Sequence, residues 1–384
     1  MKVIKTGIIG TGFSGSFHAE ALRRVPGVQI VAVCGSSLEK ALAFAEQFGI
    51  PKAYGTPEEL IADPEVQAIH NCTPNDMHYR VNSQVLHAGK HLLSEKPLTK
   101  NSQESAKLLE LSRQSAGVSG VCFNYRHFPL VRQSKEYIEK GDFGQANLVY
   151  GGYTQDWLLY DTDYSWRLDT EKNGLSRAIA DIGSHWCDTV QHILGQRIVE
   201  LCADLKTVHP IRQKTKGSVT TFSGAAAAVT EPMEVKTEDY GSVLVHFENG
   251  TQGVFTVSQV SAGRKNRLTF EIAAESAALA WDQEKPNSLW IGRRDEANRQ
   301  LMRDPGLLSS PAAALAHYPG GHQEGWPDGM KNLLIDFYKA VRNKEAGEPV
   351  SPSFASMEDS HHIMKIIDAI LKSHAERRWV KVDE

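Results

Sequence analysis

The feature that most limits the possible folds of this chain is a glycine-rich turn near its start. Gly10-Thr11-Gly12-Phe13-Ser14-Gly15 has the spacing G-x-G-x-x-G, directly after a strand-like run and at the start of a helical pattern. The first glycine permits the tight turn, the second lets the backbone approach a pyrophosphate, and the third lets helix and strand pack closely. The helix N-terminus offers free N–H groups to phosphates. These residues (Gly10, Gly12, Phe13, Ser14 and Gly15) therefore predict a dinucleotide site.

The first third of the chain alternates short apolar runs with amphipathic stretches. The strand-like runs cover residues 6–9, 29–33, 68–71, 91–93 and 118–123, and the helical patterns cover 16–24, 38–48, 75–88 and 102–115. Strands that alternate with helices predict a doubly wound parallel sheet with helices on both faces. We place this dinucleotide-binding domain at residues 1–128.

The pattern changes from about residue 146 to longer strands with few helices between them. Two alternating runs flank Asn249-Gly250, which is a strong hairpin signal. Further strands are expected at 266–273, 277–281 and 288–292, helices at 178–194, 329–343 and 357–375, and a surface loop at 215–230. Residues 129–384 should thus form a second, α/β domain with a large open, mostly antiparallel sheet.

Charge and cysteine usage exclude several classes of protein. The chain of 384 residues has 42 Lys and Arg against 46 Asp and Glu, a formal net charge of −4, which argues against nucleic acid or an anionic membrane as partner. No apolar run is long enough to span a bilayer, and the first residues lack the pattern of a signal peptide. The 5 cysteines contain no C-x-x-C pair. We expect a cytoplasmic protein without a disulfide framework or a zinc knuckle.

The end of the second strand bears on the choice between NAD and NADP. A carboxylate about 20 residues after the glycine turn usually bonds the ribose 2′-hydroxyl, but neither Asp nor Glu stands there. Ser36, Ser37 and Lys40 could receive a 2′-phosphate, and they are equally consistent with ordinary turn and N-cap residues. The sequence therefore leans slightly to NADP.

Two further turns follow strands at the edge of the sheet where ligands bind. Thr73, Pro74 and Asn75 follow one strand, and Glu95-Lys96-Pro97 follows the next. Each proline restricts the residue before it to extended geometry. Lys96 is a candidate donor to a substrate oxygen, and a solvated loop lysine is the alternative.

These motifs together resemble the Gfo/Idh/MocA family, named for glucose–fructose oxidoreductase, inositol dehydrogenase and a rhizopine-catabolism protein. The likeness rests on the glycine turn, on T-P-N-x-x-H from Thr73 to His78 and on E-K-P from Glu95. It continues through Trp166-Arg167, D-I-G-S-H from Asp181 to His185 with Asp188, and G-H-x-E-G from Gly321. The resemblance implies a Rossmann domain, a second domain with an open sheet, and homodimers or homotetramers formed through that sheet. It also implies reversible NAD(P)-linked oxidation of sugars, cyclitols or their derivatives.

The expected chemistry is hydride transfer, which needs a base for the hydroxyl proton and a donor for the developing alkoxide. Asp181 and His185 are spaced i, i+4 in a helical pattern and should share one face. A histidine suits proton transfer near neutral pH. By resemblance, His185 is the acid/base, Lys96 bonds the reacting oxygen and Asp181 assists. A polar cluster at a helix N-terminus is the alternative from the residues alone.

Further contacts are expected around this centre. The resemblance implies cofactor contacts at His78, Glu95, Asn124, Arg126, Trp166 and Arg167. Substrate contacts are expected at Tyr153, Gln155, Asp156, Trp157 and His322. No metal is expected, because a third ligand beside Asp181 and His185 is missing. Asn173-Gly174-Leu175 departs from the double glycine that usually precedes D-x-G-x-H, which could alter the rim of the pocket.

The sequence therefore predicts an NAD(P)-dependent dehydrogenase that acts on a secondary hydroxyl of a sugar, glycoside or cyclitol. Two alternatives remain open at this stage. One is an NAD-dependent glycoside hydrolase that works through transient oxidation, and the other is a non-catalytic regulator that responds to a dinucleotide.

Overall fold

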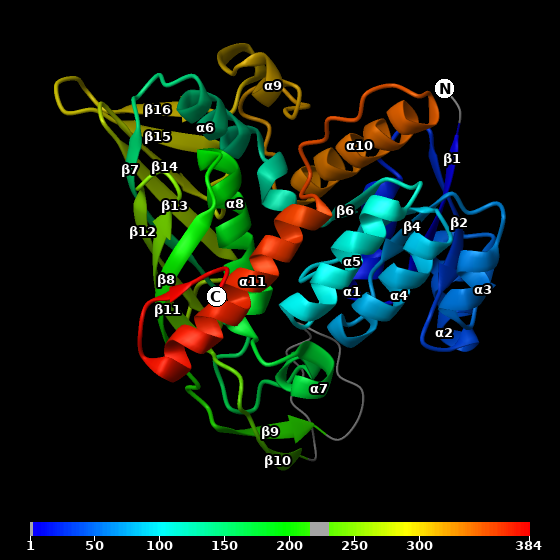
Figure 1. Ribbon diagram of the computed structural model, residues 1–384. Helices are drawn as coiled ribbons and strands as arrows, with labels where there is room; N and C mark the ends of the chain where they lie inside the picture. Colours follow the sequence, from blue (N-terminus) through cyan, green and yellow to red (C-terminus); the bar gives the residue numbers. More distant parts are fainter. Residues whose placement is uncertain (1–2, 216–229) are drawn as a thin grey trace. The chain divides into compact units, whose positions relative to one another are not determined.

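The computed structural model describes residues 3–215 and 230–384, which form two compact units (Figure 1). Unit 1 comprises Met1–Asn124 and Pro327–Met364, and unit 2 comprises Tyr125–Trp326 and Lys365–Glu384. The chain first passes between units close to the boundary expected at residue 128, but it later returns to unit 1 for residues 327–364. The loop expected at 215–230 lies, apart from its two end residues, outside the described residues. No helix among the described residues is long and apolar enough to cross a membrane.

Unit 1 is built on a six-stranded sheet in which every neighbouring pair is parallel. Its strands are β1 (Ile4–Ile9), β2 (Val28–Cys34), β3 (Lys52–Tyr54), β4 (Ala68–Asn71), β5 (His91–Ser94) and β6 (Ser119–Val121). The order β3-β2-β1-β4-β5-β6 reverses direction beside β1, and ligands bind at such a switch point. The predicted doubly wound domain is confirmed.

Several helices of unit 1 begin at a residue whose side chain caps them, and α2 ends at a glycine. They are α1 (Phe13–Leu22), α2 (Leu38–Phe48), α3 (Pro57–Ala62), α4 (Asn75–His87), α5 (Ser102–Gln114) and most of α10 (Trp326–Glu345). Ser37, Thr56 and Asn101 each accept an N–H of the first turn and so cap α2, α3 and α5. Gly49 ends α2 in the left-handed conformation, with φ of 57°.

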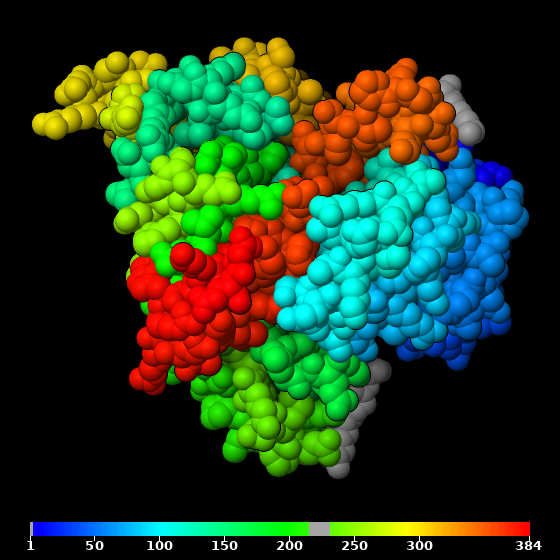
Figure 2. Space-filling model, in the orientation of Figure 1, coloured from blue at the N-terminus to red at the C-terminus, as the bar shows by residue number. Residues whose placement is uncertain are grey.

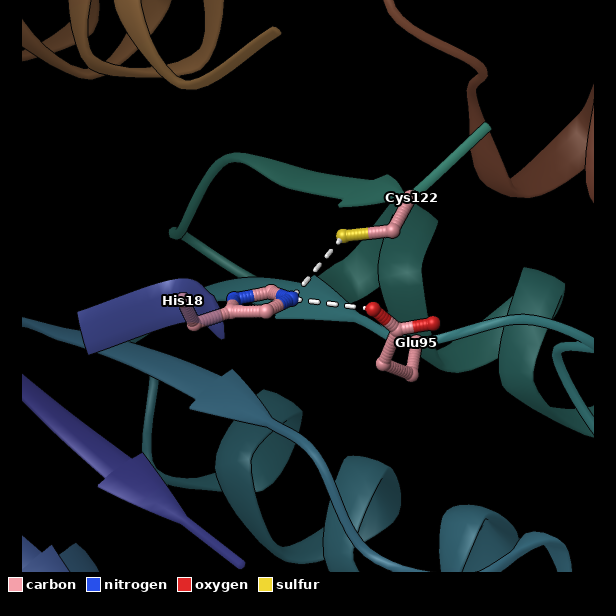
Figure 3. A group of neighbouring side chains, drawn as sticks. All are labelled: His18, Glu95 and Cys122. Atoms are coloured by element: carbon pink, nitrogen blue, oxygen red, sulfur yellow. Dashed lines mark hydrogen bonds and ion pairs between the residues drawn. The ribbon is translucent and has the colours of Figure 1, made fainter. Parts of the chain in front are cut away.

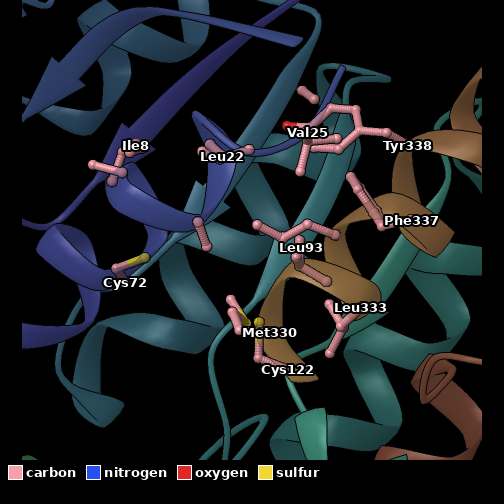
Figure 4. Packing of buried hydrophobic residues seen from close by; sticks show 14 of the residues in the cluster. Ile8, Leu22, Val25, Cys72, Leu93, Cys122, Met330, Leu333, Phe337 and Tyr338 are labelled. Carbon is pink, nitrogen blue, oxygen red and sulfur yellow. The ribbon is translucent and has the colours of Figure 1, made fainter. Parts of the chain in front are cut away.

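The core of unit 1 includes one face of α10, a helix more than 200 positions beyond the last strand of the sheet. Figure 4 shows Met330 and Leu333 of α10 beside Leu93 of β5. Phe337 and Tyr338, one turn further along, are fully buried in the same cluster. In Figure 2 the orange atoms of α10 lie against the blue and cyan atoms of the N-terminal part. The C-terminal part of the chain therefore completes the first core.

Unit 2 contains a nine-stranded sheet, order β16-β15-β14-β13-β7-β12-β11-β8-β17. The strands are β7 (Ala146–Thr154), β8 (Ile198–Lys206), β11 (Tyr240–Phe247), β12 (Gln252–Ser258), β13 (Arg267–Ala274), β14 (Ala278–Asp282), β15 (Ser288–Gly292), β16 (Arg299–Met302) and β17 (Val380–Lys381). Only β7 and β12 pair in parallel, so the predicted mostly antiparallel sheet is confirmed. The predicted hairpin joins β11 and β12 through Asn249-Gly250. A small separate sheet pairs β9 (Ile211–Thr215) with β10 (Thr230–Glu234).

Helices α6 (Pro129–Glu139) and α8 (Ser184–Leu194) cover one face of the large sheet (Figure 1). Trp186 of α8 stacks on Phe255 of β12, with ring centroids 4.5 Å apart. The remaining helical segments are η1 (Asn124–His127), η2 (Trp166–Leu168), α7 (Thr170–Asn173), η3 (Ile179–Gly183), η4 (Pro305–Leu307), α9 (Ser310–Ala313) and α11 (Met357–Glu376).

The opposite face of the large sheet carries a row of exposed apolar side chains. Phe255 points toward α8, so its neighbour Val254 points away from that helix. Leu244, Val254 and Tyr150 are register partners on β11, β12 and β7. Their side chains are 47%, 38% and 43% exposed, respectively. An apolar row that crosses three strands is a candidate surface for association.

Candidate active site

The glycine turn of unit 1 has the shape that a pyrophosphate needs. Gly10 has φ of +117°, and a Cβ there would lie 2.4 Å from the carbonyl oxygen of Cys72. A Cβ on Gly15 would lie 2.1 Å from the carbonyl oxygen of Gly10. A Cβ on Gly12 would meet nothing within 4 Å, so the backbone is open at this position. The residues present therefore fit a dinucleotide phosphate.

Helix α1 has no side-chain cap at its N-terminus. Gly12 is its N-cap and supplies no side-chain hydrogen bond, and its first turn has no acidic residue. An anion approaching this end therefore meets N–H groups and the positive end of the helix dipole. Phe13 is 52% exposed and stacks on Phe17, while Ser14 is partly buried.

The candidate ribose-reading residues are exposed at the end of β2. The Lys40 ammonium donates to the Ser36 hydroxyl over 3.2 Å. The Ser37 hydroxyl accepts the Lys40 N–H over 3.3 Å and caps α2. The N-cap interpretation thus holds for Ser37, while Ser36 and Lys40 present a hydroxyl and a cation to the solvent.

A buried chain of polar side chains links the turns that follow β4 and β5. Asn71 accepts the hydroxyl of Thr73 over 2.7 Å and donates to Asn82 over 2.8 Å. Asn82 donates to the Ser94 hydroxyl over 2.9 Å, which in turn donates to the carbonyl oxygen of Glu95 over 2.9 Å. Both candidate ligand-binding turns are therefore fixed by the same set of hydrogen bonds. The sequence gives no sign of the central link, Asn82.

His78 is fully buried and joins the same two turns through backbone carbonyls. Its Nδ1 lies 2.7 Å from the carbonyl oxygen of Pro97, and its Nε2 lies 2.9 Å from that of Thr73. Burial lowers the pKa of His78, although both carbonyls oppose this shift. A neutral ring donates to one of the two carbonyls. Lys96, directly before Pro97, is partly buried, and its backbone N–H donates to Glu95 Oε2 over 3.2 Å. Asn75 is the first residue of α4, and Pro74 is its N-cap.

In unit 2, the helix expected from residue 178 begins instead with the π-helical turn η3. Ser184 donates its N–H to the carbonyl oxygen of Ile179, five residues earlier. Glu238 accepts the N–H groups of Arg177 (2.8 Å) and Ile179 (2.9 Å) and so holds the start of this turn. The helical stretch expected at residues 178–194 is therefore a π-turn followed by α8, and the expectation that Asp181 and His185 share a face stays a prediction. Single π-turns of this kind are frequent at functional sites.

Asp181, in the middle of η3, has two partners from other elements. Its Oδ2 accepts a hydrogen bond from Gln259 Nε2 over 2.9 Å. Its Oδ1 lies 3.7 Å from Arg167 Nε, and the Arg167 guanidinium lies 4.6 Å from the centroid of the Trp166 ring. The structure thus brings the predicted residues Trp166 and Arg167 to Asp181, a grouping that the sequence does not reveal.

His185 is buried beside a closed ring of hydrogen bonds. Its imidazole lies 5.0 Å from the ring centroid of Tyr125 and 6.1 Å from that of Tyr153. Tyr153 donates to Asn266 Oδ1 (2.5 Å), Asn266 Nδ2 donates to Tyr125 (3.2 Å), and Tyr125 donates to the Tyr153 hydroxyl (2.6 Å). Gln155 joins this ring by donating to Asn266 Oδ1 over 2.8 Å. Sequence reasoning missed Tyr125 and Asn266.

Burial decides the protonation of the two phenols. It raises the pKa of Tyr125 to about 12 and that of Tyr153 well above its ordinary value. Both phenols therefore stay protonated near neutral pH and act as hydrogen-bond donors. Among these three rings, only the imidazole of His185 suits proton transfer near neutral pH.

Other predicted residues occupy distinct positions. Trp157 Nε1 donates to Gln155 Oε1 over 2.8 Å, next to the hydrogen-bonded ring. Asp156 pairs with Lys265 over 2.7 Å. Arg126 binds the carboxylate of Asp188 through Nε and Nη2, at 2.8 and 2.6 Å, and both residues are buried. This pair anchors α8, the helix that carries His185. Asn124, at the end of the first stretch of unit 1, is also buried.

His322 is exposed in a loop that two buried residues hold in shape. Glu324 accepts the N–H groups of His317 (2.7 Å) and Tyr318 (3.1 Å). Arg303 forms an ion pair with Glu324 over 3.3 Å and donates to the carbonyl oxygens of Tyr318 and His322. No pattern in the sequence points to Arg303.

Asn173, which stands where the double glycine was expected, is buried and lies close in sequence to a buried group of charged residues. Asn173 Nδ2 donates to the carbonyl oxygen of Ser176 over 2.7 Å, and Gly174 has φ of +98°. Arg177, which follows, is fully buried with Arg212 around Asp239.

Comparisons with known proteins agree with this geometry. Residues 4–123 match the model of an oxidoreductase family with an NAD-binding Rossmann fold, and residues 131–280 match the GFO/IDH/MocA C-terminal domain. Levoglucosan dehydrogenase of Pseudarthrobacter phenanthrenivorans is 29% identical, over 100% of this chain and 99% of the relative. Myo-inositol 2-dehydrogenase of Thermotoga maritima is 22% identical over 99% of each chain. A solved structure of levoglucosan dehydrogenase with NADH and L-sorbose has a TM-score of 0.88 and 27% identity, covering 99% of this chain and 98% of that one.

Proposed function

Because the chain belongs to the Gfo/Idh/MocA family of NAD-binding oxidoreductases, which includes sugar and cyclitol dehydrogenases, we propose that it oxidises one secondary hydroxyl of a sugar, glycoside or cyclitol. The observation that carries this proposal is the position of His185 beside the ring of Tyr125, Tyr153 and Asn266. An imidazole next to neutral hydrogen-bond donors can accept a proton while those donors orient a polyol.

We assign roles to this chain's residues as follows. A bound nicotinamide dinucleotide would supply the hydride acceptor. His185 takes the proton of the reacting hydroxyl, Lys96 donates a hydrogen bond to the same oxygen, and Asp181 assists. Tyr153, Gln155, Asp156, Trp157 and His322 are proposed substrate contacts, of which Tyr153 and Gln155 belong to the buried hydrogen-bonded group.

The cofactor site is proposed to extend from the glycine turn to the turns after β4 and β5. Gly10, Gly12, Phe13, Ser14 and Gly15 would face the phosphates. His78 and Glu95 would act by shaping the turns at Thr73 and Lys96, because their side chains form hydrogen bonds with other residues of unit 1. Asn124, Arg126, Trp166 and Arg167 remain predictions.

Both dinucleotides are candidates at the ribose end. The exposed pair of Ser36 and Lys40 favours a 2′-phosphate, whereas the levoglucosan dehydrogenase structure contains NADH. The glycoside hydrolase and the regulator are not favoured, because the named relatives are dehydrogenases. A cytoplasmic location remains a prediction from the sequence.

The function is tested by absorbance at 340 nm with NAD and NADP in parallel, against levoglucosan, L-sorbose, pyranoses, glycosides and inositols. We expect a rise for at least one pair of polyol and dinucleotide. Protein that binds a dinucleotide but gives no rise with any polyol would contradict the dehydrogenase. Release of sugar from a glycoside without net reduction would instead support the hydrolase.

We also propose that the protein is a homodimer or homotetramer joined through the open face of the large sheet. The row of Leu244, Val254 and Tyr150 supports this surface. The double variant Leu244→Glu/Val254→Glu should shift the mass in light scattering from oligomer to monomer, since buried carboxylates would face each other. Leu307→Glu, at an exposed position in η4, is the matched control and should keep the mass. A wild-type monomer would refute the proposal.

A further inference from the structure

His18 lies at the centre of a buried polar group in unit 1, of which the proposed function uses only Glu95. Figure 3 shows its Nε2 facing both Glu95 and Cys122. Nε2 lies 2.9 Å from Glu95 Oε1 and 3.7 Å from Cys122 Sγ. Nδ1 lies 2.7 Å from Nδ1 of His70. His18 and His70 are both 0% exposed.

The hydrogen bonds beyond His70 fix where the protons are. Thr6 donates its hydroxyl to the carbonyl oxygen of Ala68 (3.0 Å), so Tyr338 must donate to Thr6 (2.8 Å). The Tyr338 oxygen then accepts from His70 Nε2 over 2.8 Å. Burial, with the nearby His18, holds the pKa of His70 well below its ordinary value, so the His70 ring is neutral. Its Nδ1 is therefore a lone pair, and His18 must donate to it from Nδ1.

A proton or a metal ion must then lie between His18 Nε2 and Glu95. A neutral His18 with its proton on Nδ1 would point a lone pair at a carboxylate oxygen 2.9 Å away. Burial alone would raise the pKa of Glu95, but the hydrogen bond and charge of His18, with the charge of Lys96, lower it to about 2. With the carboxylate ionised, the hydrogen bond from Nε2 to Oε1 requires a proton on His18 Nε2 as well as on Nδ1.

A metal ion is the other cation to consider, because one ligand atom from each of His18, Glu95 and Cys122 lies within 4.8 Å of the others. Two ligands of a tetrahedral zinc, each about 2.0–2.2 Å from the metal, are separated by roughly 3.3–3.5 Å. The separation of 2.9 Å is that of a charge-assisted hydrogen bond. Burial also raises the pKa of the Cys122 thiol well above its ordinary value, so the thiol stays protonated. The geometry therefore favours a proton over a metal.

We propose that His18 is a doubly protonated positioning residue that fixes Lys96 through Glu95. Glu95 Oε1 accepts from His18, and Oε2 accepts the backbone N–H of Lys96 over 3.2 Å. His18 lies on α1, the helix that begins at the glycine turn. One carboxylate thus connects the phosphate-binding helix to the turn that carries Lys96. The catalytic part of this inference rests on the proposed dehydrogenase function, while the protonation state does not.

The protonation state is tested by NMR of the full chain with ¹⁵N-labelled histidine. Spectra of His18→Gln and His70→Gln identify the two rings. We expect His18 to carry protons on both nitrogens at pH 8 and His70 to carry one, on Nε2. In Glu95→Gln, His18 should lose its Nε2 proton, because the carboxylate that holds the charge is gone. A neutral His18 in the wild type, or a stoichiometric metal removed by a chelator, would overturn the proposal.

The positioning role is tested by comparing His18→Gln with His87→Gln. His87 is an exposed histidine of α4 whose ring bonds the carbonyl oxygen of Ser83. His18→Gln should lower kcat by about 10- to 100-fold with dinucleotide affinity changed less than threefold, because the ammonium donor is misplaced. It should also shift the backbone amide resonance of Lys96. His87→Gln should change neither quantity. An unmoved Lys96 amide would reject the positioning role even if no substrate is ever found.

Discussion

His185→Ala is expected to lower kcat by about 10²- to 10⁴-fold, because it removes the group proposed to take the hydroxyl proton. The neighbouring phenols cannot replace it, since burial keeps Tyr125 and Tyr153 protonated. Lys96→Ala should produce a loss of similar size by removing the proposed donor to the reacting oxygen. Initial rates at 340 nm over pH 5 to 10 measure both effects. The limb of the pH profile that belongs to the imidazole should disappear in His185→Ala.

The control for His185→Ala is dinucleotide affinity, measured by quenching of tryptophan fluorescence. The affinity of His185→Ala should stay within about threefold of wild type, since its side chain belongs to unit 2 and the glycine turn to unit 1. Turnover of His185→Ala or Lys96→Ala within twofold of wild type would show that the catalytic assignment is wrong.

Asp239→Ala should destabilise the protein by about 3–5 kcal/mol, the usual loss when one partner of a buried ion pair is removed. Asp239 Oδ1 accepts from Nη2 of both Arg177 and Arg212, the latter over 2.7 Å, and all three side chains are 0% exposed. Its Oδ2 accepts the N–H of Val208 over 2.7 Å. The variant leaves two guanidinium groups buried without their carboxylate. Urea unfolding of the full chain measures the loss.

Arg299→Ala is the matched control, because it removes an exposed ion pair with Glu296, which contributes at most about 1 kcal/mol. The stabilisation by Asp239 also depends on pH. Burial alone would raise its pKa, but Arg177 and Arg212 hold it below the ordinary value. The contribution is therefore complete above about pH 4, near the pKa of the unfolded state, and is lost as pH falls through the lower folded value. A loss under 1 kcal/mol for Asp239→Ala would contradict this account.

The sequence predicts the first sheet well because its signals are local. The strand at 68–71 and the helix at 38–48 have the expected ends, because each is an apolar or amphipathic run bounded by turn residues. Strand β3 was missed, since Lys52–Tyr54 is three residues long and only partly buried. The helix at 178–194 was predicted without its π-turn, which depends on Glu238 more than 50 positions later.

Site residues, too, are predictable where their signal is local and are missed where their role depends on distant contacts. Lys96, Asp181 and His185 lie in recognisable motifs, and the glycine turn has its expected form. Asn266 has no local signal, because its role consists of hydrogen bonds to residues more than 100 positions earlier. The same holds for Arg303, whose partners Tyr318 and Glu324 follow it by 15 or more positions and whose partner Asn287 precedes it by 16. Motifs can be recognised in the sequence, whereas contacts between residues far apart in the chain cannot.

The return of residues 327–364 to unit 1 has a consequence for how the protein is made. During synthesis, the first 124 residues leave the ribosome long before α10 does. Until then, Leu22, Val25 and Leu93 lack the Met330, Leu333 and Phe337 side chains that complete their core. The nascent N-terminal segment therefore presents an apolar surface throughout the translation of unit 2, which is the kind of surface that chaperones bind. The dinucleotide-binding half, although it comes first in the chain, is among the last parts to be finished.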